Sequence, residues 1–343
     1  MASPTSTQDQ SALRKWLSAL SKDQRWCVLI NADPDAMGAA EALKRITANR
    51  TRMDICCINE ITRPDNLTMI RVLHIKMTLW KPALKAKYTH FAIVDSQPHH
   101  NASFQDIPFS LIIDHHPLPK EPCALAEPAF LCIQPEKSAA CTIFTEYLRA
   151  LRLRPSPTLA TAMLLGIRCD TYDFERSGTK ADLEAYQWLS NRADSMLVRQ
   201  IVRSEYLADW LPFFARACTN IQQCRRTGAH VFLGDVATPD MLVAIADFFN
   251  RVHGLRWIAV SGIIRKETVV VIFRGDGSRD VGRLADACFY DVGSGGGHKF
   301  MARAEFQLAR VPAGRECGGF IQHRLEKRKL RPLKKDTEDK QPV

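Results

Sequence analysis

Carboxylate and imidazole side chains gather in four short segments of this chain. They are Asp33-Pro34-Asp35, Asp95 in VDSQP, the triplet Asp114-His115-His116, and Asp170 in GIRCDT. Carboxylate oxygens are the ligands that Mg²⁺ and Mn²⁺ prefer, and imidazole also suits Mn²⁺ and other transition metals. Two such ions about 3.5–4 Å apart can clamp a phosphoryl group and lower the pKa of a bound water. One such segment alone is more often a helix cap or a turn, but four together predict a metal site.

The apolar runs before these acidic residues have the length of buried strands. We expect strands over Trp26–Ile30, Met53–Ile58, Phe91–Val94 and Leu111–Ile113, and a helix over Ala36–Ala48. Strands that alternate with helices predict a parallel α/β sheet, whose ligands bind beyond the carboxyl ends of the strands. The four acidic segments are therefore expected at four strand ends, close enough to share ions.

A second α/β unit is expected after a helical connection over Ala181–Trp210. Its predicted strands are His230–Val236, Arg256–Ile264, Thr268–Phe273 and Ala302–Leu308, with helices over Pro239–Phe249 and Arg283–Cys288. The predicted divisions are a first domain at 20–190, a helical linker at 191–224, a second domain at 225–312 and a basic tail at 313–343. The run Gly293–Gly297 is either a flexible turn or a cradle of backbone amides for an anion.

The composition excludes several classes of protein. Of 343 residues, 24% are charged and 46% hydrophobic, which is typical of a globular protein. No apolar run approaches the roughly 18 residues of a transmembrane helix, and Met1–Gln10 lacks a signal pattern, so we expect a cytoplasmic protein without a membrane partner. The eleven cysteines form no Cys-x-x-Cys pair, which argues against a zinc ribbon. The net charge of +10 includes the basic run His323–Lys335, either a solvated terminus or a non-specific grip on polyanions.

The ordered motifs resemble those of a known family. NADPDAMG, VDSQP, IIDHHP and LLGIRCDT resemble motifs I to IV of the DHH phosphoesterases, and Ser138–Leu148 resembles the stretch between motifs III and IV. Gly293–Ala304 resembles the glycine-histidine loop of the companion DHHA1 domain. The resemblance covers Trp26 to Phe306 and is closest to the nanoRNase and nucleotide phosphatase-like branch. It implies an N-terminal DHH domain with a mainly parallel sheet flanked by helices, and a smaller C-terminal α/β DHHA1-like domain.

The resemblance also implies roles for individual residues. It implies two divalent metal ions, with Mn²⁺ expected first and Mg²⁺ as the alternative. The implied ligands are Asp33, Asp35, Asp95, His115 and Asp170, with Asp95 bridging both ions. Asp114 is expected to orient a histidine, and His116 to lie near the scissile phosphate, so that Asp95, Asp114 and His116 form the catalytic set. The implied substrate-binding residues are Arg274, Gly295, Gly296, Gly297 and His298.

Two positions depart from the family pattern. Nanornase-like members carry a metal-binding histidine where this chain has Leu29, so we expect the first metal site to be weak unless the amide oxygen of Asn31 contributes. The segment Met301-Ala302-Arg303 replaces the usual Ala-Gly after the loop histidine. We therefore expect contacts with the substrate to differ in detail.

The expected reaction is hydrolysis of short RNA or DNA oligonucleotides, or of small nucleotides, by a metal-activated water. NanoRNases, 3′-phosphoadenosine 5′-phosphate phosphatases and cyclic-dinucleotide phosphodiesterases are the implied types. One alternative is an exopolyphosphatase or pyrophosphatase; the DHHA1-like segment disfavours it, because pyrophosphatase-like relatives carry a different C-terminal domain. Another is a catalytically impaired module that binds nucleotides or RNA; retention of the other ligands argues against it. A homodimer is compatible with the sequence.

Overall fold

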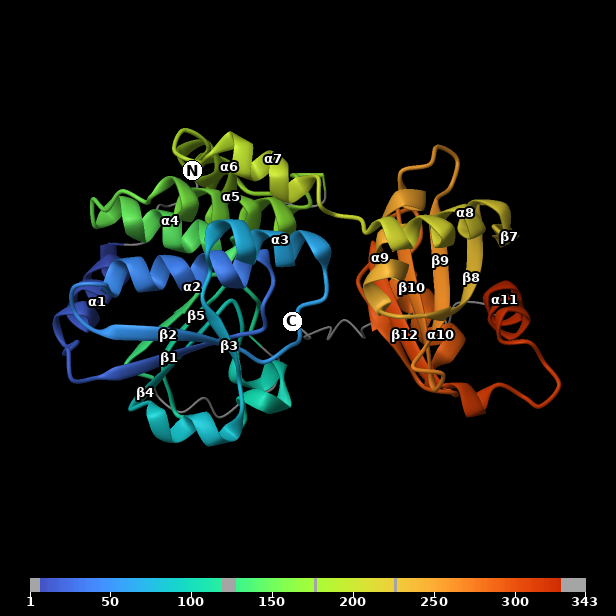
Figure 1. Ribbon diagram of the computed structural model, residues 1–343, viewed down its shortest axis with the longest axis horizontal. Helices are drawn as coiled ribbons and strands as arrows, with labels where there is room; N and C mark the ends of the chain where they lie inside the picture. The colour runs from blue at the N-terminus through green and yellow to red at the C-terminus, as the bar shows by residue number, and fades with distance from the viewer. Residues whose placement is uncertain (1–6, 119–127, 176–177, 225–226, 328–343) are drawn as a thin grey trace, which may run out of the picture. The chain divides into compact units, whose positions relative to one another are not determined.

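The computed structural model describes residues 7–118, 128–175, 178–224 and 227–327 (Figure 1). The chain divides into two compact units between Glu205 and Tyr206. Helix α7 (Ser195–Val202) buries Ile201 in the core of the first unit, whereas β7 (Gln222–Cys224) joins the sheet of the second. None of the helices in the described part of the chain is long and apolar enough to span a bilayer.

The first unit contains the expected parallel sheet. Its strands are β1 (Arg25–Ile30), β2 (Arg52–Cys57), β3 (Met77–Leu79), β4 (His90–Val94), β5 (Phe109–Asp114) and β6 (Phe130–Ile133). They run in the order β3-β2-β1-β4-β5-β6, and every neighbouring pair is parallel. The prediction of a parallel α/β sheet is confirmed. The order reverses between β1 and β4, which is where an open sheet of this kind leaves a crevice for ligands.

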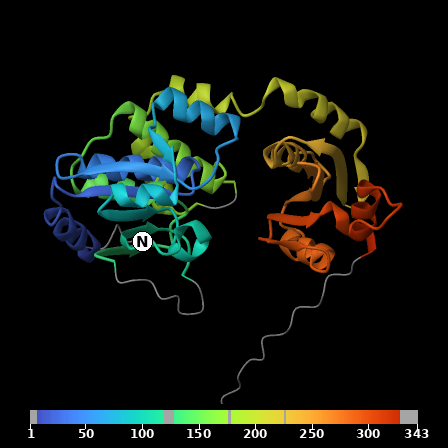
Figure 2. The ribbon, with the colours of Figure 1, turned by 60° about the horizontal axis from the view of Figure 1, so that its bottom comes forward.

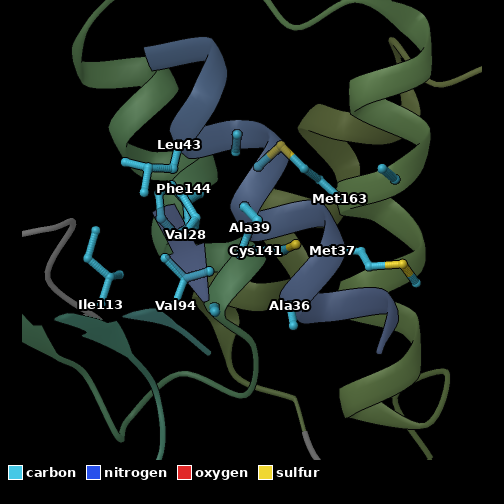
Figure 3. Packing of buried hydrophobic residues seen from close by; sticks show 14 of the residues in the cluster. Val28, Ala36, Met37, Ala39, Leu43, Val94, Ile113, Cys141, Phe144 and Met163 are labelled. Carbon is cyan, nitrogen blue, oxygen red and sulfur yellow. The ribbon is translucent and has the colours of Figure 1, made fainter. Parts of the chain in front are cut away.

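Helices pack against one face of this sheet and form the larger core. The helices of the unit, besides α7, are α1 (Thr7–Ser18), α2 (Pro34–Thr47), α3 (Pro64–Leu73), α4 (Ala140–Ala150), α5 (Pro157–Thr171) and α6 (Lys180–Ser190). Figure 3 shows Val28 and Val94 of the sheet beside residues of α2 and α4 in this core. The other face carries a smaller apolar cluster that includes Leu29, Ile93 and Phe104, near the short turns η1 (Pro82–Lys87), η2 (Pro98–His100) and η3 (Ala102–Phe104).

Glycine allows α2 and α5 to approach closely. A Cβ atom on Gly38 would lie 2.7 Å from Cys141 Sγ and 3.0 Å from the carbonyl oxygen of Ala162. A Cβ on Gly166 would lie 2.8 Å from Asp35 Oδ1. Real Cβ atoms do not tolerate such distances, so glycine at both positions sets the spacing between the two helices.

The second unit has a mixed sheet with helices on both faces. Besides β7, its elements are η4 (Ala208–Trp210), α8 (Leu211–Thr219), β8 (Gly228–Val236), α9 (Pro239–Asn250), β9 (Trp257–Ile264), β10 (Thr268–Gly275), α10 (Val281–Phe289), β11 (Ser294–Gly297), β12 (Met301–Gln307), η5 (Leu308–Arg310) and α11 (Cys317–Lys327). The strand order is β11-β12-β10-β9-β8-β7, and β8 and β9 are parallel. Helices lie on both sides of this sheet (Figure 2). Alternate residues of β10 belong to two apolar clusters, one shared with α9 and the other with α10.

Three expectations differ from the structure. The helical segment expected over Ala181–Trp210 is broken into α6, α7 and η4, because polar residues end α6 and Asp194 caps α7. The glycine-rich run is a short strand, β11, paired with β12, and not a flexible turn. Residues 317–327 of the expected tail form α11, whose Phe320, Ile321 and Leu325 are buried in the second unit. The basic run after Lys327 lies outside the described residues.

The close crossing of α2 and α5 predicts that Gly166→Ala destabilises the protein. The added methyl group would meet Asp35 and Cys141, and such overpacking typically costs about 1–3 kcal/mol, which exceeds the roughly 1 kcal/mol preference of a helix for alanine. Thermal unfolding with and without the substitution measures the change. Gly319→Ala is the matched control, since Gly319 lies in α11 with open space around its Cβ position. An unchanged or raised midpoint for Gly166→Ala would show that the helices can separate without loss.

Candidate metal centre

Asp35 is held by the beginning of another helix. It lies in the first turn of α2 and is fully buried. Its Oδ2 accepts a hydrogen bond from the backbone N–H of Ala140 at 2.5 Å, and its Oδ1 accepts one from Cys141 at 2.9 Å. These amides begin α4, whose N-cap residue Ala139 has no side-chain oxygen to offer. The Asp35 carboxylate therefore takes the place of that cap, and the helix dipole favours its negative charge.

Asp95 and His115 face each other across the ends of β4 and β5. Asp95 follows β4 in the left-handed conformation, with φ at 58°, which is uncommon outside glycine. His115 Nδ1 lies 3.3 Å from the carbonyl oxygen of Lys137, to which it can only donate. In the neutral ring, Nε2 is therefore the nitrogen without a proton, and it lies 3.2 Å from Asp95 Oδ1 and 3.2 Å from Asp170 Oδ2.

Asp170 comes from a helix, which corrects the expectation of a fourth strand end. It lies in the last turn of α5, and Gly166 precedes it by one turn on the same helical face. The approach of α2 at Gly166 is what brings Asp35 next to this face. An apolar run before the aspartate did not distinguish a buried helix from a strand, because both are rich in the same side chains.

Four residues thus converge with the donor set of a metal site. One ligand atom from each of Asp35, Asp95, His115 and Asp170 lies within 4.8 Å of the others, and a second, overlapping group joins Asp95, Asp114, His115 and His116. Asp95 Oδ1 and His115 Nε2 are buried, and neither has a hydrogen-bond partner among the described residues. A buried oxygen and a buried nitrogen left in this state are what a cation would satisfy, and mixed oxygen and imidazole ligands suit Mn²⁺.

Asp33 and Leu29 do not belong to either group of possible metal ligands. Asp33 lies outside both groups; its Oδ1 accepts from the N–H of Ala36 at 2.9 Å and caps α2. The Leu29 side chain is fully buried in the apolar cluster on the opposite face of the sheet from the large core. Asn31 is exposed just beyond β1.

Burial of several carboxylates together changes their protonation. Burial raises the pKa of Asp35 to about 6, with the charge of Asp170 acting in the same direction, and burial likewise raises the pKa of Asp33 to about 6. Burial raises the pKa of Asp95 and that of Asp170 above the ordinary aspartate value. Burial lowers the pKa of His115, but the contacts with Asp170 and Asp95 outweigh it and raise the pKa to about 12. Without a cation, the cluster therefore retains protons.

Asp114 and Gln97 hold His116 beside the cluster. Asp114 is fully buried; its Oδ1 accepts from His116 Nδ1 at 2.8 Å, and its Oδ2 accepts from Gln97 Nε2 at 2.7 Å. Burial alone would raise the pKa of Asp114, but the hydrogen bonds from His116 and Gln97 lower it. Gln97 Nε2 also donates to the carbonyl oxygen of His116 at 2.9 Å. The expected orienting role of Asp114 therefore has a matching geometry.

Gln97 and Gly166 are site residues that the sequence argument did not single out. Gln97 lies two residues after Asp95 in the VDSQP motif, and this place within the motif was the available signal; its burial is known only from the structure. Gly166 lies within GIRCDT, and its importance depends on a second helix that the sequence does not reveal.

The expected substrate-binding residues lie in the second unit and have different surroundings. Arg274 is the next-to-last residue of β10; its Nε donates to Asp247 Oδ1 of α9 at 2.6 Å, and its Nη1 donates to the carbonyl oxygen of Phe273 at 3.0 Å. A Cβ on Gly295 would lie 2.6 Å from the carbonyl oxygen of Ala285, so this glycine lets β11 pack on α10. Gly296 has open space at its Cβ position, and His298 is exposed beyond the end of β11.

One curated protein resembles most of this chain in sequence. An uncharacterized protein of Methanocaldococcus jannaschii, MJ1633, is 29% identical over 280 residues, which are 81% of this chain and 57% of that protein. The chain therefore spans little more than half the length of this curated relative.

Solved structures share the fold at low sequence identity. An exopolyphosphatase-related protein from Bacteroides fragilis superposes with a TM-score of 0.74 at 16% identity, covering 94% of this chain and 96% of that one. RecJ from Thermus thermophilus, solved with Mn²⁺, superposes with a TM-score of 0.50 at 14% identity, covering 93% of this chain and 54% of RecJ. Residues 27–167 match the DHH family, N-terminal domain. The segment that matches this family model includes α2, the strand ends of β1, β4 and β5, and all but the last turn of α5.

Proposed function

We propose that this protein is a metal-dependent phosphoesterase that hydrolyses short oligonucleotides or small nucleotides. The observation that carries the proposal is the convergence of Asp35, Asp95, His115 and Asp170 within 4.8 Å at the carboxyl edge of a parallel sheet. The DHH family match over these strands supports it.

We propose two divalent ions, with Mn²⁺ as the preferred ion and Mg²⁺ as the alternative. Asp35, Asp95, His115 and Asp170 would hold one ion, and Asp33 with Asp95 would contribute to the other. When bound, the ions supply an activated water and neutralise charge on the phosphoryl group. Because Leu29 is apolar and buried on another face, a site at Asp33 would have fewer ligands, and its ion should bind more weakly.

Hydrogen bonds within the chain orient the side chains of His115, His116 and Asp35. The Lys137 carbonyl fixes the ring of His115 with its bare Nε2 toward the ligand cluster. Asp114 keeps a proton on Nδ1 of His116, which leaves Nε2 to accept or return a proton at the reacting phosphate. The backbone amides at the start of α4 fix the orientation of Asp35 without using its remaining lone pairs.

We propose that Arg274, Gly295, Gly296, Gly297 and His298 bind the anionic end of the substrate. Asp247 accepts from Nε of Arg274 and the Phe273 carbonyl accepts from Nη1, so Nη2 is the nitrogen we assign to a ligand. Inorganic polyphosphate belongs in the substrate panel, because the Bacteroides fragilis protein is described as exopolyphosphatase-related. Incubation with Mn²⁺ and dinucleotides, short RNA, 3′-phosphoadenosine 5′-phosphate, cyclic dinucleotides or polyphosphate, followed by product analysis, tests the proposal and ranks the substrates. Absence of turnover across the panel would favour a nucleotide-binding module.

Asp95→Asn should abolish turnover and weaken metal binding. The amide keeps the size of the side chain but loses the charge that neutralises the ions, so we expect Mn²⁺ affinity to fall by at least about 100-fold. Calorimetric titration of metal-free protein measures this, and in the wild type it should show one tight and one weak ion. Asp23→Asn, the same change at an exposed position, is the control. Two equal tight sites in the wild type would mean that another group replaces the missing histidine.

Stability without metal should depend on pH through Asp35. Its pKa of about 6 in the folded protein lies above the ordinary 3.8, so the folded state binds this proton more tightly than the unfolded state. That stabilisation is present below about pH 4 and is lost as the pH rises through about 6. The melting midpoint of the wild type minus that of Asp35→Asn should therefore fall over this range in EDTA. With Mn²⁺ it should rise instead, since the ligands must lose protons to bind. A difference that stays flat in EDTA would contradict the raised pKa.

Gly296→Val separates substrate contact from folding. Valine favours strands and meets open space at this position, so the melting midpoint should stay unchanged. If a substrate phosphate approaches this backbone, kcat/KM should fall by about 10-fold or more, in line with the 1.5–3 kcal/mol of a charged hydrogen bond. Gly295→Val is the contrasting variant, because its side chain would collide with α10 and should lower the melting midpoint. Unchanged kinetics for Gly296→Val would remove this strand from the substrate site.

A further inference from the structure

A row of histidine rings extends from the metal ligands along the edge of the first sheet. The ring centroids of His115 and His116 are 4.3 Å apart, those of His116 and His100 are 5.3 Å apart, and those of His100 and His99 are 4.4 Å apart. His100 belongs to η2, directly after the Asp95 segment, and its ring stands at 80° to that of His116. His100 therefore lies one ring away from the group that would act at the phosphate.

The backbone determines which nitrogen of His100 carries the proton. The N–H of Gln97 donates to His100 Nδ1 at 3.2 Å, and Ser96 Oγ lies 3.2 Å from the same atom. A backbone N–H can only donate, so Nδ1 must be the acceptor, and the proton of a neutral imidazole is then on Nε2. Within the described residues, no hydrogen bond involves His100 Nε2, and the residue is exposed.

His116 has its proton on the other ring nitrogen, and Gln97 contacts both His116 and His100. Its Nδ1 donates to Asp114, which leaves Nε2 without a proton when the ring is neutral. Gln97 is fully buried and binds Asp114 and His116 through its side chain while its backbone N–H holds His100. Asp114 thus sets His116 as an acceptor at Nε2, the Gln97 backbone sets His100 as a donor, and the Gln97 side chain holds the first pair in place.

We propose that His100 is a substrate-contacting residue whose Nε2–H donates a hydrogen bond to a non-bridging oxygen of the phosphoryl group beside His116. This inference rests on the proposed phosphoesterase function. His100 is a donor and not a general acid. Giving up the Nε2 proton would leave an imidazolate, and protonating Nδ1 would set it against the Gln97 N–H. The leaving group must therefore take its proton from elsewhere.

The kinetic test uses two phosphodiesters that share one nucleotide and differ in the leaving group, a 4-nitrophenolate and a nucleoside alkoxide. His100→Ala should lower kcat/KM by about 10- to 100-fold for both, as loss of one hydrogen bond to a charged group implies. His100→Gln, which keeps an N–H donor, should restore most of the loss. His99 is the neighbouring exposed histidine on the same turn, and in the proposal it does not contact the substrate. The kcat/KM of His99→Ala should therefore stay within about twofold of the wild type. A loss confined to the alkoxide would identify a general acid, and equal loss in His99→Ala would identify a structural effect of the turn; either result overturns the proposal.

A second measurement does not depend on turnover. Nitrogen-15 spectra of the Mg²⁺-loaded protein should show the proton of His100 on Nε2, and inorganic phosphate should shift that signal in the wild type but not in Asp95→Asn. A proton on Nδ1, or a signal that phosphate leaves unchanged, overturns the donor assignment. If the tautomer and the phosphate shift are found while no substrate in the panel is hydrolysed, the donor assignment stands and the proposed catalysis fails.

Discussion

Close packing of like charges at one edge of the first sheet is the constraint on which the rest of this unit depends. Asp35, Asp95 and Asp170 converge on His115 in a largely buried space, where carboxylates repel one another more strongly than in water. Three local features hold these carboxylates together despite that repulsion. The start of α4 binds Asp35, the left-handed backbone turns Asp95 inward, and Gly166 lets two helices meet. A divalent cation would relieve the remaining repulsion, so the fold is arranged for one.

The topology explains why these residues meet although they are far apart in sequence. The strand order reverses between β1 and β4, and the segments after these strands carry Asp33, Asp35 and Asp95. Strand β5 lies next to β4 and supplies the Asp114 triplet at the same edge. Helix α5 is the exception, because it reaches the site by packing on α2 and not by ending in the sheet.

Hydrogen bonds give three neighbouring histidines three different roles. His115 donates from Nδ1 to a backbone carbonyl and presents Nε2 to the ligand cluster. His116 donates from Nδ1 to a buried carboxylate, so its Nε2 can exchange a proton. His100 accepts at Nδ1 from a backbone amide, which leaves a donor on Nε2. In the proposed function, the same side chain would thus serve as a ligand, an acid–base group or a hydrogen-bond donor according to its neighbour.

The sequence by itself determined the parallel sheet, the strands that precede Asp33, Asp95 and Asp114, and the set of residues able to bind a cation. Hydrophobic runs of strand length followed by acidic residues carry that information, because burial and metal chemistry both restrict residue type. Tertiary structure alone decided that Asp170 arrives on a helix, that Asp33 lies outside the tight group, and that Gln97 connects His100 to His116. Those features depend on how α2, α4 and α5 cross and on which backbone group faces each ring nitrogen. The hydrophobic pattern of a single segment carries no information about either, because both depend on segments that are distant in the sequence.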